Sequence, residues 1–153
     1  MRKFEKISFE QFKKDVVDDK ELYKIFNMPK RETEFAAGYD FFSLQNFVIK
    51  PGETKKIPTG IKAIMNDDEV LLLIVRSSQG FKYNLRMCNQ VGVIDKDYYN
   101  NKDNEGHIWI KLKNEGEKDY IVKREDKIIQ GLFIKYLTTE DEDNIFSNRG
   151  SNY

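Results

Sequence analysis

From Phe35 onward, the chain consists of short runs rich in β-branched and aromatic residues, separated by clusters of turn-forming residues. This alternation is typical of an all-β barrel or sandwich. The clearest turn is Lys50-Pro51-Gly52-Glu53, because proline presets φ at the second turn position and glycine accepts a positive φ at the third. The pattern predicts strands at residues 39–43, 47–49, 55–57, 60–65, 70–75, 91–94, 107–113, 120–122 and 128–136.

The segment before these strands has a helical pattern instead. Ser8 and Gln11 form a capping box, and Phe9, Phe12 and Val16 then fall on one helical face. This spacing predicts an amphipathic helix that continues or restarts within the segment. We therefore expect an N-terminal helical extension, a β-barrel and a polar, mobile tail, at residues 1–28, 29–140 and 141–153 respectively.

Composition excludes several classes of function. Lys plus Arg and Asp plus Glu each number 26, so no overall basic field indicates a nucleic-acid or acidic-membrane partner. One cysteine cannot form an intramolecular disulfide, and no N-terminal apolar run resembles a signal peptide or a membrane span. We expect a soluble, cytoplasmic protein. A single histidine and a single cysteine exclude a His/Cys zinc cluster, so the fitting metal is Mg²⁺ bound largely through a substrate's phosphates.

Two of the predicted strands carry further information. The run from Val70 to Val75 is apolar on both faces, so it should lie in the middle of the body or pack one face against a neighbouring subunit. Ile108, Ile110 and Leu112 alternate with Trp109 and with lysines, which predicts one buried and one exposed face. At 153 residues, the chain is long enough to bury such a core as one domain.

Polar and charged residues interrupt the strand pattern in four short stretches. They are Ala37-Gly38-Tyr39-Asp40, Arg76-Ser77-Ser78-Gln79-Gly80, Cys88 to Asn100 and Glu125 to Gln130. In the second stretch, the guanidinium of the arginine offers a forked pair of donors to phosphate oxygens. The small hydroxyl residues and the glycine let backbone N–H groups approach an anion closely. In the third, a short apolar strand ends abruptly in Asp95 and is followed by Asp97 and Tyr98, so it delivers Asp95 and an aromatic wall to one spot. Taken singly, each stretch also fits an ordinary polar loop or turn.

Taken together and in this order, these stretches resemble the successive motifs of the trimeric dUTP diphosphatases (dUTPases), over roughly residues 29–149. The resemblance implies a jelly-roll-like β-barrel, assembled as a homotrimer with its sites at subunit boundaries. It also implies hydrolysis of dUTP to dUMP and pyrophosphate with Mg²⁺. The third stretch is the most specific part of the match.

The resemblance assigns roles to individual residues. Asp95 matches the catalytic carboxylate, which orients and deprotonates the water that attacks the α-phosphorus. Such a base works with an ordinary pKa of about 4, because it is ionised at neutral pH. Tyr98 matches the aromatic residue that packs under the deoxyribose and leaves no room for a 2′-hydroxyl. Asp40 matches a carboxylate at the metal and phosphate end of the site, near Mg²⁺ without binding it directly.

The remaining assignments concern the base and the triphosphate. The groups matched to the uracil pocket are Asn89, the backbone around Gly92, Val93 and Ile94 and, facing them across a hairpin, Trp109. The residues matched to the triphosphate are Arg76, Ser77, Ser78, Gln130 and Arg149, in part from a different subunit than Asp95. Tyr153 matches the aromatic residue that closes over the uracil.

The chain departs from the family pattern in several places. Asn100 to Glu105 should lengthen the hairpin beside the base. Glu125 and Lys127 stand where the fourth motif commonly has glycine and arginine. The fifth motif is only partly present, because the glycine-rich run of the family does not follow Arg149.

Two other functions stay open at this point. A dCTP deaminase would share the fold and the Arg-Ser-Ser loop, but it needs a glutamate facing the base, for which Glu105 is the only nearby candidate. A non-catalytic module that senses dUTP or contacts a regulatory protein would fit the incomplete fifth motif, although the chain retains Asp95. Outside the motifs, Cys88 is expected to be a small buried residue and His107 a surface or rim residue.

Overall fold

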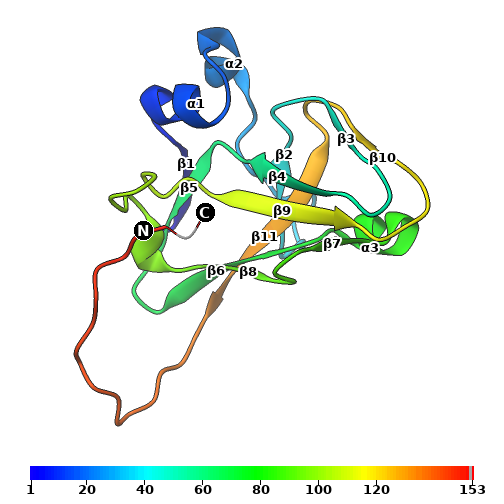
Figure 1. The fold of residues 1–153 in the computed structure, drawn as a ribbon. Helices are drawn as coiled ribbons and strands as arrows, with labels where there is room; N and C mark the ends of the chain where they lie inside the picture. Colours follow the sequence, from blue (N-terminus) through cyan, green and yellow to red (C-terminus); the bar gives the residue numbers. More distant parts are fainter. Residues whose placement is uncertain (152) are drawn as a thin grey trace.

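The computed structural model describes residues 1–151 and 153, which form a β-barrel with a helical N-terminal segment (Figure 1). The first strands are β1 (Lys3–Lys6), β2 (Tyr39–Phe42), β3 (Phe47–Ile49), β4 (Thr54–Pro58), β5 (Ile61–Ile64) and β6 (Glu69–Ile74). The later strands are β7 (Leu85–Met87), β8 (Gly92–Ile94), β9 (Trp109–Asn114), β10 (Tyr120–Val122) and β11 (Lys127–Lys135). The α-helices are α1 (Phe9–Asp15), α2 (Lys20–Ile25) and α3 (Ser77–Tyr83).

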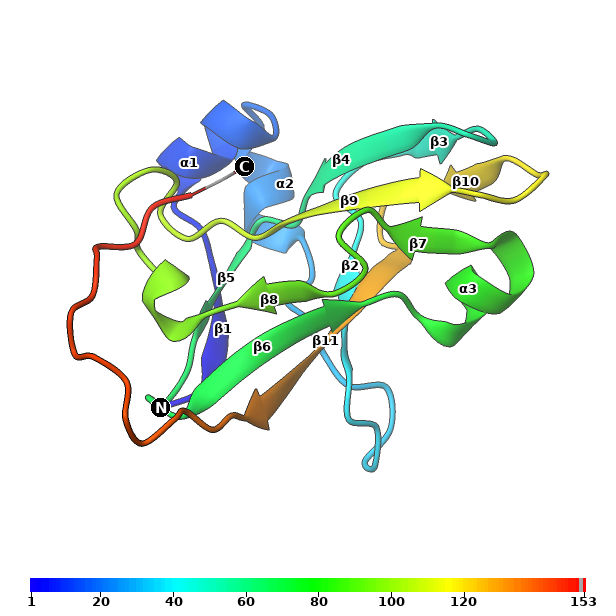
Figure 2. The same ribbon diagram turned by 60° about the horizontal axis from the view of Figure 1, so that its bottom comes forward.

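Two main sheets build the walls of the barrel. One has the strand order β2-β11-β6-β8 and the other the order β4-β9-β7, while β1 pairs with β5 and β10 with β3. Figure 2 shows the two main sheets on opposite sides of the body. Between them lie Leu71 and Leu73 of β6, and Ile110 and Leu112 of β9, all buried. The all-β prediction is confirmed, and the doubly apolar strand lies between two neighbours in its sheet, as expected.

The N-terminal segment contains more than the predicted helix. β1 pairs antiparallel with β5, with Lys3 opposite Ile64. The helical part is divided in two, because the chain leaves α1 at Val16 and restarts where the Asp19 carboxylate caps α2. This cap accepts a hydrogen bond from the Leu22 N–H at 3.0 Å. The segment is therefore both a strand of the barrel and a helical cover.

Aromatic packing holds the helical cover on the barrel. Phe12 is fully buried and stacks on Phe26, with the ring centroids 5.6 Å apart. Ile7 is also fully buried, and its carbonyl accepts a hydrogen bond from the Tyr23 hydroxyl at 2.6 Å. Burying each such side chain contributes about 1.5–3 kcal/mol to folding. The core thus fixes the position of α1.

The hairpin expected between residues 91–94 and 107–113 is not formed. β8 pairs with β6, whereas β9 pairs with β4 and β7. The chain between β8 and β9 crosses from one main sheet to the other and includes the short 3₁₀ helix η1 (Lys96–Tyr98). The unpredicted strand β7 takes the place opposite β9, where Met87 and Leu112 are register partners and both are buried.

The Arg-Ser-Ser stretch begins helix α3, which the sequence did not predict. Gln79 anchors this helix, because its buried amide donates to the Ile128 carbonyl at 2.7 Å and to the Tyr120 hydroxyl at 3.2 Å. Its Oε1 accepts a hydrogen bond from the Arg76 N–H at 2.7 Å. The helix ends at Asn84, whose φ of 53° is left-handed. These contacts fix the start of α3 on the barrel.

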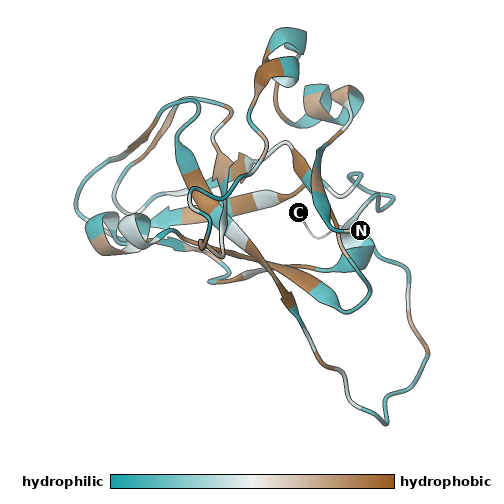
Figure 3. Cartoon of the chain, turned by 180° about the vertical axis from the view of Figure 1, so that it is seen from behind, coloured by the Kyte–Doolittle hydropathy of each residue, from teal (hydrophilic) through white to brown (hydrophobic). Residues whose placement is uncertain are grey.

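The outer face of the larger sheet is apolar in its middle. Leu72 of β6 is the register partner of both Leu132 of β11 and Val93 of β8, and Val93 is 58% exposed. In Figure 3, which shows the chain from behind, the lower part of the diagonal strand β11 is brown. Exposed apolar patches of this kind mark interaction surfaces. No helix in the described part of the chain is both long and apolar enough to cross a membrane.

Candidate active site

Asp95 follows the last residue of β8 and precedes η1, so its backbone is held by a buried strand on one side and a tight turn on the other. Its side chain remains 44% exposed, and its Oδ2 lies 2.6 Å from Nη2 of Arg149. Nε of the same guanidinium lies 2.9 Å from Oδ1 of Asp97. A carboxylate in this setting is accessible to water and is paired with a cation from the C-terminal tail.

A pocket of about 340 Å³ lies on the β4-β9-β7 side of the barrel. Asn89, Cys88 and Trp109 line it, and Tyr153 reaches it from the tail. The Tyr153 hydroxyl donates to the Trp109 carbonyl at 3.2 Å. Cys88 is half-buried rather than fully buried, because it lies in the wall of this pocket. A flat ring could enter here between an aromatic side chain and an amide.

Tyr98 is buried next to this pocket and makes edge contact with Tyr153, with ring centroids 5.9 Å apart. Its hydroxyl donates to the His107 carbonyl at 3.2 Å and accepts a hydrogen bond from the Asn104 amide at 2.7 Å. Burial raises the pKa of Tyr98, so the phenol stays protonated at neutral pH. The ring is therefore held in a single orientation at the pocket edge.

Other residues matched to the base pocket lie apart from it. Gly92 faces inward, where an added Cβ would be 3.0 Å from Cβ of Leu73. Ile94 is buried and Val93 points outward. None of the three side chains lines the pocket of Asn89 and Trp109. The glycine is needed because β6 and β8 approach closely at this point.

A second cavity, of about 510 Å³, lies at the start of α3. Arg76, Ser77, Ser78, Gln130 and Asp40 all line it, as the motif match predicts. Nε of Arg76 is 3.2 Å from Oδ1 of Asp40, and Gln130 donates its amide to the Val75 carbonyl at 3.1 Å. Gly38 leaves the room that Gln130 occupies, since an added Cβ would be 2.2 Å from its Oε1.

The predicted site residues thus fall into two groups within one chain. Asp95 and Arg149 line one cavity, Asn89, Trp109 and Tyr153 line another pocket, and the C-terminal tail links the two because it carries both Arg149 and Tyr153. The cavity of the Arg-Ser-Ser stretch shares no lining residue with either. Within one chain, the residues matched to the base and to the catalytic carboxylate are thus linked through the tail, whereas the Arg-Ser-Ser residues matched to the triphosphate line a separate cavity.

Comparison with known proteins identifies the family to which the chain belongs. A family model described as dUTPase matches residues 24–152. The chain belongs to the dUTPase family. Over 118 residues it is 44% identical to the deoxyuridine 5′-triphosphate nucleotidohydrolase of Lactococcus lactis subsp. lactis (strain IL1403). The aligned region covers 77% of this chain and 79% of that protein.

Solved dUTPase structures share the fold. The crystal structure of dUTPase from Streptococcus mutans superimposes with a TM-score of 0.72 at 39% identity and covers 90% of this chain and 98% of that one. A mutant dUTPase of phage phi11 of S. aureus has a TM-score of 0.69 at 22% identity, covering 94% and 95% of the two chains. That structure is described as revealing the coordination of a structural Mg(II) ion. The jelly-roll-like dUTPase barrel expected from the motifs is confirmed.

The carboxylates of this dUTPase do not form a metal cage. Within the described residues, no group of three or more His, Cys, Asp or Glu side chains is placed to hold an ion. Oδ2 of Asp40 lies 3.5 Å from Nζ of Lys127, while its Oδ1 faces Arg76. The available donors are oxygens, which suits Mg²⁺ carried mainly by phosphates.

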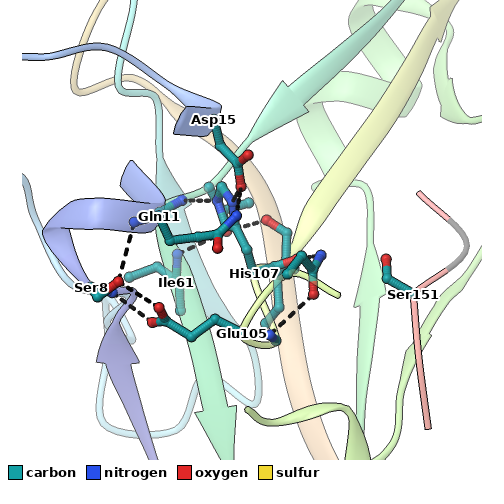
Figure 4. Close-up of polar contacts among 12 residues, drawn as sticks. Ser8, Gln11, Asp15, Ile61, Glu105, His107 and Ser151 are labelled. Carbon is teal, nitrogen blue, oxygen red and sulfur yellow. Dashed lines mark hydrogen bonds and ion pairs between the residues drawn. The ribbon is translucent and has the colours of Figure 1, made fainter. Parts of the chain in front are cut away.

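Glu105 does not face the base. Its carboxylate accepts a hydrogen bond from the Ser8 N–H at 2.6 Å (Figure 4). It also pairs with Nζ of Lys62 at 3.0 Å. It lines none of the pockets that Asn89 or Asp95 lines. The residue that a deaminase would require is therefore bound to the N-terminal segment, which removes the deaminase alternative for this dUTPase.

Sequence reasoning missed several residues of the site. Asp97 shares Arg149 with Asp95, and Gln79 fixes the start of α3. His107, expected at the surface, is fully buried because the chain turns inward before β9. A carboxylate two residues after Asp95 is a usable signal, whereas nothing in the sequence around His107 indicates burial.

Proposed function

We propose that this dUTPase hydrolyses dUTP to dUMP and pyrophosphate, with Asp95 as the general base. One observation carries the proposal. The exposed Asp95 carboxylate is held by Arg149, and the same tail brings Tyr153 over the pocket of Asn89 and Trp109. The tail thus links the pocket matched to the base with the carboxylate, and its arginine supplies a cation that can bind phosphate.

In the proposed reaction, Asp95 accepts a proton from a water molecule. The water oxygen forms a bond to the α-phosphorus while the bond from that phosphorus to the pyrophosphate oxygen breaks. Arg149 releases Asp95 when the triphosphate competes for its guanidinium, because a phosphate carries more negative charge than one carboxylate. Its charge then stabilises the departing pyrophosphate, as positioned cations do in phosphoryl transfer.

Nucleoside selection falls to the aromatic pocket. Asn89 supplies hydrogen-bonding groups to the uracil edge, and cytosine would leave some of them unpaired, so discrimination is strong. Tyr98 lies against the deoxyribose, where its buried ring excludes a 2′-hydroxyl. Tyr153 covers the base.

We also propose a homotrimer in which one subunit completes the site of another. Arg76, Ser77, Ser78 and Gln130 line a cavity separate from Asp95, so a triphosphate bound at Asp95 would meet these groups only from a second chain. The apolar outer face around Leu72 offers surface for such an assembly. The single cysteine is consistent with a cytoplasmic location.

Mg²⁺ fits this site as a partner of the triphosphate. We expect its protein contacts to be few and to lie at the Asp40 end, where an acidic side chain already balances Arg76 and Lys127. When bound, Mg²⁺ supplies neutralising charge to the phosphate oxygens. The chain's own residues bind the base, orient the water and hold the arginine.

The test is an assay of products from dUTP, UTP and dCTP in H₂¹⁸O with Mg²⁺. We expect dUMP and pyrophosphate from dUTP alone, with ¹⁸O in the dUMP phosphate, because the water attacks the α-phosphorus. Label in pyrophosphate would contradict the mechanism. dUTP formed from dCTP would restore the deaminase, and tight binding of dUTP without turnover would favour a sensing module.

A further inference from the structure

A buried imidazole connects the N-terminal helices to the base pocket. His107 is fully buried, and its Nε2 accepts a hydrogen bond from the Gly60 N–H at 2.9 Å. Nδ1 must therefore carry the proton of the neutral ring, and it lies 2.6 Å from Oδ2 of Asp15. Burial lowers the pKa of His107, in agreement with a neutral ring, although the adjacent Asp15 opposes that shift.

On its other side, His107 touches the residues that hold the nucleoside. Its carbonyl accepts hydrogen bonds from the Tyr98 hydroxyl at 3.2 Å and from the Asn104 amide at 3.1 Å. Its ring packs against Trp109, with centroids 5.2 Å apart. A rotation of the His107 ring would therefore disturb Trp109, and a backbone shift that accompanies it would displace the carbonyl that holds Tyr98.

Asp15 reaches this ring from the end of α1 (Figure 4). Its Oδ2 also accepts a hydrogen bond from the Gln11 amide at 2.9 Å, one helical turn earlier. At the other end of the helix, Ser8 caps the first turn and binds Glu105 in the inserted loop. The helix thus holds the loop before β9 at two points, Asp15 on His107 and Ser8 on Glu105.

We propose that Asp15 is a positioning residue that acts through His107 to set the places of Tyr98 and Trp109 in the nucleoside pocket. The helical segment before the barrel then takes part in substrate selection. This inference rests on the proposed function, because it takes Tyr98 and Trp109 to be the walls that meet the sugar and the base. Without Asp15, the buried Nδ1–H loses its acceptor, and the ring tautomer and orientation are no longer specified.

The experiment compares Asp15→Ala with Asp15→Asn and with Glu10→Ala. The asparagine oxygen can still accept from Nδ1–H, so this variant keeps the geometry without the charge. Glu10 is a matched control on the same helix, since its side chain is 82% exposed and pairs with Lys13 at the surface. Trp109 is the single tryptophan of the chain, so its fluorescence reports on the pocket without substrate.

For Asp15→Ala, we expect KM for dUTP to rise about tenfold, the loss typical of a hydrogen bond to a charged group. kcat should stay within about threefold of wild type, because no group at the reacting phosphorus is removed. The preference for dUTP over UTP should fall by about tenfold as Tyr98 loses its fixed place. Trp109 emission should change in the unliganded protein. Asp15→Asn should restore most of each property, and Glu10→Ala should alter none.

Unchanged Trp109 emission, or an unchanged preference for dUTP over UTP, would overturn the proposal. An equal response in Glu10→Ala would also overturn the proposal, because it would show that Asp15 affects the pocket only through the general stability of the helix. If Asp15→Ala does not fold, Gln11→Ala, which removes only the amide that orients Asp15, is judged by the same criteria. If the wild-type protein does not hydrolyse dUTP, the proposed function fails, whereas Trp109 emission and the affinity for a non-hydrolysable dUTP analogue still test the role of Asp15.

Discussion

At the scale of single residues, the proposed mechanism depends on which of two neighbouring carboxylates, Asp95 or Asp97, acts as the general base. Asp95 and Asp97 both bind Arg149, at 2.6 and 2.9 Å, and both are substantially exposed. Asp95 directly follows the strand β8, which is paired with β6, whereas Asp97 lies inside the short helix η1. Fixed geometry is what a general base needs, because proton transfer requires the water within hydrogen-bond reach.

Exchange of either carboxylate for its isosteric amide separates their roles. Asp95→Asn should lower kcat for dUTP by about 10²–10⁴-fold, the range for loss of a general base. Asp97→Asn removes one exposed ion pair and should leave kcat within about threefold. Steady-state rates and circular dichroism of both variants check this. Equal losses in the two variants, or unfolding of Asp95→Asn, would refute the assignment.

At the scale of elements, the prediction from sequence was accurate where periodicity is strong. The runs that became β3, β6 and β10 were located to within one residue, because each combines branched residues with clear turn signals. β1 and β7 were missed, since a short strand gains its pairing from partners far away in the sequence. α3 was missed because its anchor, Gln79, is a polar residue whose partners lie on later strands.

The N-terminal helices are an integral part of the folded body. Phe12 is fully buried against the rings of Tyr23 and Phe26, so Phe12→Ala should lower the free energy of unfolding by about 3–5 kcal/mol. Glu10→Ala, on the exposed side of the same helix, should change it by no more than about 0.5 kcal/mol. Urea denaturation followed by circular dichroism measures both. A small loss for Phe12→Ala would mean that α1 packs only loosely on the barrel.

At the scale of the whole molecule, we propose that one chain holds two separated half-sites. Asp95 and Tyr98 are assigned to one half, and Arg76 with its serines, which line a cavity separate from that of Asp95, to the other. If neighbouring subunits combine these halves, a chain inactivated by a change in one half can be complemented by a chain inactivated in the other half. If one chain completed its own site, such rescue would be impossible.

Mixed oligomers test this arrangement. Asp95→Asn and Arg76→Ala should each be inactive alone, while co-expression of the two should restore roughly a quarter of wild-type activity, because random cyclic assembly gives about one intact site in four. Asp95→Asn combined with Tyr98→Ala is the matched control and should stay inactive, since both changes lie in one half. Light scattering on the same samples gives the number of subunits. Absence of rescue in the first mixture would show that the sites are not shared.

By itself, the sequence determined the fold class, the family motifs and the carboxylate after β8, because these depend on local periodicity and on residue types at fixed spacing. Tertiary structure alone decided that His107 is buried, that Glu105 binds the N-terminal segment, and that β8 and β9 belong to different sheets. Each of these depends on contacts between residues far apart in the chain. Such contacts are selected by packing and by the need to pair buried polar groups, and neither leaves a local pattern.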